Sequence, residues 1–163
     1  MTCRRLPLAV LLAALLGTAA CSHYQLGTAG RLAFTSLYVE PPDMRALVPE
    51  AQPVIGRAVR TAFIHDGRVA LTDSATDADA TLRLIVRDYH RDVATVRPDD
   101  TGLARKFRIT LGADATLIDN RTGKVLFKDR RLVAQRDIFT DSGQLQAEYQ
   151  ILPLLAQDLA DQA

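Results

Sequence analysis

FRITLGADATL, residues 107–117, alternates apolar side chains at odd-numbered positions with mostly polar ones at even-numbered positions. A period of two places the two sets on opposite faces of a β-strand, so this segment predicts a strand with one buried face. Residues 119–124 contain Asn120 and Gly123, which favour a chain reversal, and residues 125–136 are apolar enough to return as the partner strand. The sequence therefore predicts a long β-hairpin.

The return strand changes its apolar parity partway along its length. Val125 and Phe127 are odd-numbered, whereas Leu132 and Ala134 are even-numbered, and Asp-Arg-Arg at 129–131 lies between them. A β-bulge at this point, or a hairpin that protrudes beyond the sheet, would explain the change.

Three shorter strands precede the hairpin. Residues 31–40 alternate with apolar side chains on both faces and stop before Pro41. Residues 69–72 predict a short strand, and residues 80–87 predict a strand with one charged face. Residues 91–102 are charged and end in Pro-Asp-Asp-Thr-Gly, which is typical of a loop.

Two amphipathic helices complete the pattern. The first begins between Pro49 and Pro53 and ends at Gly67, and the second is capped by Asp141 or Ser142. Their apolar stripes carry Val54, Ile55, Ala58, Val59, Ala62 and Phe63 in the first helix and Leu145, Tyr149, Leu152, Ala156 and Leu159 in the second. The order of elements predicts an α+β fold, a two-layer α/β sandwich in which two helices pack on one face of a mixed four- to five-stranded sheet.

The first twenty residues have the features of a signal peptide. Arg4 and Arg5 precede an apolar run at 6–16 that is too short to span a bilayer. Thr-Ala-Ala at 18–20 stands directly before Cys21 and resembles a lipobox, in which the cysteine receives diacylglycerol on its sulfur. The alternative is a plain secretory cut that leaves a free thiol. We expect lipid attachment at Cys21.

The sequence predicts three segments: a lipoprotein signal peptide at 1–20, a lipidated tether at 21–30 and a single domain at 31–163. A chain of about 150 residues buries roughly 70 per cent of its unfolded surface, which is enough for one core. Lipidation would use the only cysteine left after cleavage, so no internal disulfide is expected. Ser22 follows that cysteine and, by resemblance to the enterobacterial sorting rule, favours the outer membrane.

Residues that would support catalysis or metal binding do not converge in the sequence. His23, His65 and His90 are scattered, and no G-x-S-x-G, H-E-x-x-H or phosphate-loop pattern is present. Asp73 and Asp77 lie near Asp79, but they do not follow the order of a calcium loop, and turn-forming carboxylates are the simpler interpretation. We therefore expect no enzyme activity, no cofactor and no metal.

Charge is distributed unevenly along the chain. Residues 83–136 contain 13 Lys or Arg and 7 Asp or Glu, a net charge of +6, whereas the rest of the chain after residue 20 has a net charge of −7. A solvated strand face and a binding surface explain this segment about equally well. Arginine suits phosphate and carboxylate, so an anionic glycolipid or an acidic protein surface is a plausible partner. Nucleic acid is implausible for a protein tethered outside the cytoplasm.

Short motifs follow one another in order through the chain: CSHYQLG at 21–27, LYVEPP at 37–42, DADATL at 77–82, RTGKVL at 121–126, and Ala147-Glu148-Tyr149 with Leu152. Together they resemble the LptE family of lipopolysaccharide-assembly lipoproteins. The resemblance implies a two-layer α/β domain that sits inside the lumen of the LptD outer-membrane barrel, binds lipopolysaccharide and helps deliver it to the outer leaflet. The implied partners are the LptD barrel and lipopolysaccharide.

A lipopolysaccharide binder needs cations that face the phosphates of lipid A, and each charge-assisted bond contributes about 1.5 to 3 kcal/mol. Five basic residues lie around the predicted hairpin, where two strands can bring them together. The predicted lipopolysaccharide contacts are Arg105, Lys106, Lys128, Arg130 and Arg131.

Two other functions compete with this one. The first is a regulatory outer-membrane lipoprotein that activates a peptidoglycan synthase, since such proteins share the lipid anchor and a small α/β domain. A tether of about nine residues argues against it, because it reaches only some 30 Å when fully extended. The second is a periplasmic hydrolase, for which a nucleophile and base pair is missing. We expect a lipid-anchored protein at the cell outer membrane, facing the periplasm or inside the barrel lumen.

Overall fold

A computed structural model describes residues 32–48, 50–95, 106–139 and 144–163, with the backbone alone described at 94–95 and 144–148. The elements in chain order are β1 (Ser36–Val39), β2 (Asp43–Met44), α2 (Ala51–Asp66), β3 (Ala70–Thr72), the short 3-10 helix η2 (Ala75–Asp77), β4 (Ala80–Thr95), β5 (Lys106–Asp119), β6 (Val125–Phe139) and α3 (Gln144–Ala160). The predicted α+β class is confirmed.

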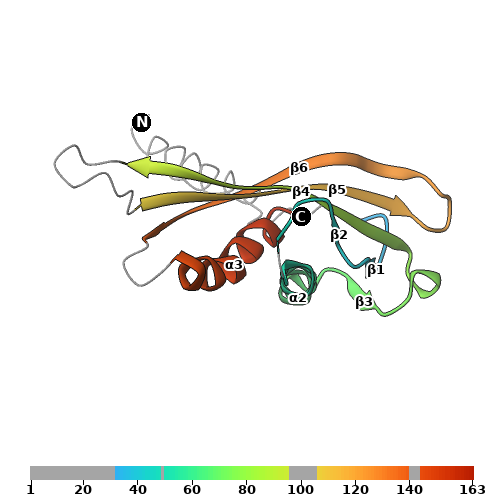
Figure 1. Cartoon of the computed structure of the whole chain (residues 1–163). Coiled ribbons are helices and arrows are strands. Elements are labelled where there is room, and N and C mark those ends of the chain that lie inside the picture. Colours follow the sequence, from blue (N-terminus) through green and yellow to red (C-terminus); the bar gives the residue numbers. More distant parts are fainter. Residues whose placement is uncertain (1–31, 49, 96–105, 140–143) are drawn as a thin grey trace, which may run out of the picture. The chain divides into compact units, whose positions relative to one another are not determined.

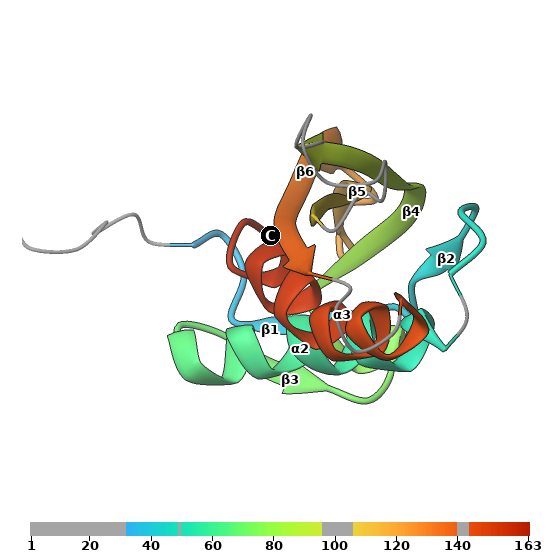
Figure 2. The same cartoon turned by 60° about the vertical axis from the view of Figure 1, so that its left-hand side comes forward.

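The strands of the described part of the chain form one mixed sheet of six strands in the order β3-β1-β4-β5-β6, with β2 paired to β4. β1 runs parallel to β3 and β4, whereas β4, β5 and β6 are antiparallel to their neighbours. Both α2 and α3 lie on one side of the long strands and pack against each other (Figures 1 and 2). The sheet exceeds the predicted four to five strands because the two-residue β2 carries no alternation that could reveal it.

The alternation at 107–117 defines the core face of the sheet. Its odd-numbered side chains face the helices, and the even-numbered ones lie on the opposite surface, which we call the open face. The fully buried side chains include Leu82, Leu84 and Val86 of β4, Ile109 and Leu111 of β5, Ile55 and Val59 of α2, and Leu155 and Leu159 of α3. Helices and sheet therefore share one hydrophobic core, but Tyr149, predicted for the apolar stripe of the second helix, is 56% exposed and lies outside it.

Helix α2 ends at the predicted glycine. Gly67 adopts a left-handed conformation with φ 68° and donates its N–H to the carbonyl of Phe63 at 3.1 Å. Glycine tolerates this φ without the strain that a Cβ would add. At the start of the helix, an ideal Cβ on Gly56 would lie 3.3 Å from Cδ of Pro42, so the helix approaches the Pro41-Pro42 turn closely.

A β-bulge interrupts β6 at the predicted position. Asp129 has φ 50°, and its N–H donates to the hydroxyl of Thr116 at 3.2 Å. The register shifts here, because Ala115 faces Arg130 while Leu117 faces Phe127. Because of this shift, the even-numbered side chains of β6 after Asp129, such as Leu132 and Ala134, lie on the core face. The bulge therefore explains the change in apolar parity.

The expected loop at 91–102 is wrong over its first residues, since β4 continues to Thr95. Arg91 pairs with Ile109 and Val93 with Phe107, so the strand is held by register with β5 although its own side chains are charged or exposed. A second bulge, at Arg87, shifts the register between Val86 and Asp88. Cross-strand pairing thus extends β4 beyond the point where its own sequence stops alternating.

Candidate functional site

The structure does not bring the predicted ligand residues into one cluster. Lys106 begins β5 opposite Phe139, whereas Arg130 lies opposite Ala115, nine residues further along β5. At about 3.4 Å per residue this separates the two positions by roughly 30 Å. Lys128 and Arg131 lie with Arg130 on β6, and two other predicted residues, Arg105 and Cys21, lie outside the described residues.

Lys106 belongs to an ion-pair cluster at one end of the long strands. Its Nζ lies 2.8 Å from Oδ2 of Asp137, and Nε of Arg108 donates to the other carboxylate oxygen at 3.0 Å. The hydrogen bond from Lys106, followed by that from Arg108, lowers the pKa of Asp137. Lys106 also lies over the ring of Phe139, with 5.8 Å between Nζ and the ring centroid. Its charge is thus balanced within the sheet.

Arg131 holds three strands together on the open face. Its guanidinium pairs with Asp88 of β4 and, through Nη1 at 3.3 Å, with Asp114 of β5. Asp114 also pairs with Arg87. The side chain reaches Asp88 by crossing Gly112, where an ideal Cβ would lie only 2.6 Å from Nη2 of Arg131. The hydrogen bond with Asp88 lowers the pKa of that carboxyl and raises the pKa of Arg131. The guanidinium of Arg131 is therefore used mainly to hold β4, β5 and β6 together.

Among the described residues, several cations near the turn between β5 and β6 lack a strong ion pair, and Figure 1 shows where this turn lies. Lys128 is 73% exposed and reaches only its neighbour Asp129, at 4.0 Å. Arg130 lies over the ring of Phe127 at 5.8 Å and, within the described residues, has no carboxylate partner. Exposed apolar side chains accompany these cations. We call this set the distal hairpin surface: Lys124, Val125, Leu126, Lys128 and Arg130.

Asn120 ties the base of this surface to the rest of the sheet. Its side-chain amide donates to the carbonyls of Ala75 at 3.0 Å and Ala78 at 2.9 Å, and it accepts from the hydroxyl of Thr81 at 3.0 Å. The sequence indicated Asn120 only as a turn residue, because its partners lie about 40 positions away. The turn is therefore fixed by side-chain contacts as well as by its backbone.

Asp79 has a structural role at the start of β4. Its carboxylate accepts the backbone N–H of Thr35 at 2.9 Å, the hydroxyl of Thr35 at 2.8 Å and the N–H of Ser36 at 3.1 Å. These bonds, led by the Thr35 N–H, lower the pKa of Asp79 to about 2. The carboxylate thus fixes the start of β1. Across the part of the chain that the structure describes, no group of three His, Cys, Asp or Glu is placed to hold a metal ion.

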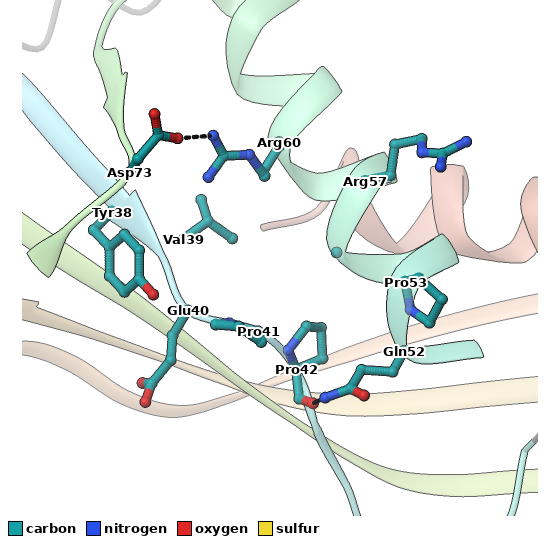
Figure 3. A pocket seen from close by; sticks show the side chains of 11 residues that line it. Tyr38, Val39, Glu40, Pro41, Pro42, Gln52, Pro53, Arg57, Arg60 and Asp73 are labelled. Atoms are coloured by element: carbon teal, nitrogen blue, oxygen red, sulfur yellow. Dashed lines mark hydrogen bonds and ion pairs between the residues drawn. The ribbon is translucent and has the colours of Figure 1, made fainter. Parts of the chain in front are cut away.

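A separate hollow of about 480 Å³ lies between β1, the Pro41-Pro42 turn and α2 (Figure 3). Its charged groups are largely engaged: Nη2 of Arg60 pairs with Asp73 at 3.0 Å, and Glu40 pairs with Arg83 at 2.7 Å. Gln52 donates to the carbonyl of Pro42 at 3.0 Å and closes the floor. The lining has no net charge that would select a ligand, so we assign it none.

The described residues include no helix that is long and apolar enough to cross a membrane. This finding applies to α2 and α3, whose apolar stripes face the core.

Solved structures with the same fold come from several bacteria. A minor lipoprotein from Acinetobacter baumannii is 19% identical with a TM-score of 0.53, and the match covers 80% of this chain and 90% of that one. A lipoprotein B from Nitrosomonas europaea is 16% identical with a TM-score of 0.52, covering 85% and 83%. A hypothetical protein from Chlamydia trachomatis is 11% identical with a TM-score of 0.56, covering 80% and 93%. At these identities the similarity concerns the fold alone.

Sequence comparison is more specific about the family. No curated protein sequence matches the chain. A family model named LptE, described as lipopolysaccharide-assembly, matches residues 34–163 and so covers every strand and helix described above.

Proposed function

Because the chain belongs to the LptE family of lipopolysaccharide-assembly lipoproteins, we propose that it binds lipopolysaccharide and acts as plug and assembly partner of the LptD barrel. In this proposal Cys21 carries the acyl chains and anchors the protein to the cell outer membrane, where the domain faces the periplasm or enters the barrel lumen. The family is non-enzymatic, so the role is one of binding and delivery.

The distal hairpin surface is the observation that supports lipopolysaccharide binding. Lipid A presents phosphates beside acyl chains, and this short stretch of β6 carries Lys128 and Arg130, on opposite faces of the strand, together with Val125 and Leu126, which are 45% and 37% exposed. Cations without a bound carboxylate can pair with phosphate without first losing an internal ion pair. The surface therefore offers both kinds of contact that such an amphiphile requires.

The other predicted contacts rank below Lys128 and Arg130 in this proposal. Lys106 already pairs with Asp137 and Arg131 with Asp88, so each would have to exchange a carboxylate for a phosphate. We therefore propose Lys128 and Arg130 as primary contacts and Lys106 and Arg131 as secondary ones, and Arg105, which lies outside the described residues, as a further contact without a rank.

The open face of the sheet supports a place inside a barrel. Apart from exposed Val133 and Phe139 on β6 it is polar, and its charges are largely neutralised by pairs that cross strands, such as Arg131 with Asp114 and Arg108 with Asp137. Barrel interiors are polar, so a rigid and polar sheet face is compatible with such a lumen.

The test compares Lys128→Glu with Arg130→Glu against a control of equal charge change, Arg45→Glu with Arg57→Glu. Both control residues are exposed and lie outside the hairpin. We expect the hairpin variant to capture lipopolysaccharide at least tenfold less than wild type at low salt, a change of about 1.4 kcal/mol. The control should keep its affinity, and all proteins should unfold at similar temperatures, since exposed changes cost about 0.5 kcal/mol or less.

Equal capture by the folded hairpin variant and wild type would refute the assignment of the distal hairpin surface. The barrel partnership is tested separately, by asking whether the full chain co-purifies with LptD from detergent-solubilised outer membranes. Absence of the barrel from that material would refute the assembly role without bearing on lipopolysaccharide capture.

A further inference from the structure

Strand β6 is an edge of the sheet. Among the described strands its partner is β5, and the other side of its 15 residues faces away from the sheet. An edge strand presents unpaired N–H and C=O groups that can template pairing with another chain. Proteins that stay monomeric cover or interrupt such edges.

The side chain of Gln162 covers this edge at its middle. Its Oε1 accepts the N–H of Val133 at 3.2 Å, and its Nε2 donates to the carbonyl of the same residue at 3.0 Å. Nε2 also donates to the carbonyl of Asp158 in the last turn of α3, at 2.9 Å. The amide thereby makes the two hydrogen bonds that the backbone of a neighbouring strand would make.

The ion pair between α3 and β6 fixes this arrangement. Arg136 reaches both carboxylate oxygens of Asp158, from Nε and Nη2, each at 2.6 Å. The carbonyl that accepts from Gln162 belongs to the same Asp158. The end of α3 that positions the Gln162 amide is therefore itself bound to β6, the strand that the amide covers.

We propose that Gln162 is an edge guard that prevents β6 from pairing with β6 of a second copy of this chain. Because the outward N–H and C=O belong to odd-numbered Val133, the odd positions around it present the groups available for pairing. An antiparallel pair of β6 strands centred on Ala134 would match Arg131 with Asp137 of the second copy, and Asp137 with Arg131 of the second copy. Arg131 and Asp137 already pair within each copy, with Asp88 and with Lys106, and opposite charges directly across two strands would extend these pairs from one copy to the other.

Exposed apolar side chains on the open face strengthen the choice of a second copy. Val133 is 39% exposed and Phe139 is 61% exposed, and both belong to the odd-numbered row that carries Arg131 and Asp137. Two-fold pairing would place Val133 next to the odd-numbered side chains of the second copy, on the same face of the joined sheet. The edge is thus complementary to itself in charge and in apolar surface, and Gln162 occupies its centre. This inference does not depend on lipopolysaccharide binding.

The test removes the amide and measures association. The full chain carries Cys21→Ala in every sample, so that acyl chains do not drive assembly, and mass is measured by sedimentation velocity over a range of concentrations. Gln162→Ala should self-associate at least tenfold more tightly than the parent. The matched control is Gln157→Ala, an exposed glutamine on α3 that should leave the parent's behaviour unchanged.

Further variants identify the surface and guard against misfolding. Adding Val133→Lys to Gln162→Ala places a cation on the edge and should restore the monomer. Gln162→Glu keeps the acceptor and loses the donor, so it should associate more than the parent even if the alanine variant fails to fold.

Three results would overturn the proposal. The first is a folded Gln162→Ala or Gln162→Glu variant that stays as monomeric as the parent. The second is association that Val133→Lys does not reverse. The third is a parent chain that already dimerises through β6 with Gln162 present.

Discussion

Replacing Leu111 measures how much the buried face of β5 contributes to the free energy of unfolding. Leu111 is fully buried, lies mid-strand between Ile109 and Ala113, and faces the helices. Leu111→Ala removes this side chain and leaves a cavity, which costs about 2 to 5 kcal/mol. For a domain of this size 1 kcal/mol lowers the melting temperature by about 4 °C, so we expect a fall of roughly 8 to 20 °C.

Leu111→Asp adds the cost of a buried carboxylate to that of the lost side chain. An unpaired buried charge costs several kcal/mol, which is comparable with a total stability of about 5 to 15 kcal/mol. We expect this variant to be largely unfolded by near-ultraviolet circular dichroism. The control is Thr110→Asp, next in sequence and on the open face. Equal melting temperatures for Leu111→Asp and Thr110→Asp would contradict the assignment of faces.

Three further changes test other parts of the structure. Cys21→Ala should leave the domain folded but release it from the membrane fraction, whereas processing before residue 21 that is insensitive to globomycin would contradict lipidation. The pKa of Asp79 is lowered to about 2, so its stabilising effect is present above pH 4 and lost as the pH falls toward 2; Asp79→Asn should therefore show a shallower fall in melting temperature across that range. Gly112→Val should displace the Arg131 guanidinium and raise the pKa of Asp88 toward its ordinary value, as followed by carboxyl NMR, and an unchanged titration would argue against the crossing.

The elements that depend on local pattern could be predicted from the sequence. The alternation at 107–117, the capping Gly67 and the bulge near Asp129 each leave a signal within a few residues. Strand β2 and the last residues of β4 leave none, because they are strands only through pairing with Val86 and β5. The resemblance to the LptE family is confirmed by the family match.

The candidate site was harder to predict for a related reason. Arg130 and Arg131 are neighbours in a strand and so lie on opposite faces of β6, but the bulge at Asp129 decides which of them lies on the core face. Arg131 reaches carboxylates that lie 43 and 17 positions away, and such pairs cannot be seen in a linear charge count. Lys124 precedes Val125 in the same basic segment, but only the folded hairpin shows that Val125 is exposed.

The position of β1 between β3 and β4 has a consequence for the order in which the fold can form. β1 pairs with β3 from Ala70 onward and with β4 from Ala80 onward, and the carboxylate that fixes its start belongs to Asp79. In the exported chain that we propose, the N-terminal side would leave the translocation channel first, and Leu37 and Val39 would be exposed before their partner strands arrive. Contacts across such sequence distances close slowly and leave apolar surface open to aggregation. In that case β1 would lack a partner strand until roughly thirty further residues had emerged, and a holding chaperone would have the most exposed apolar surface to bind during this interval.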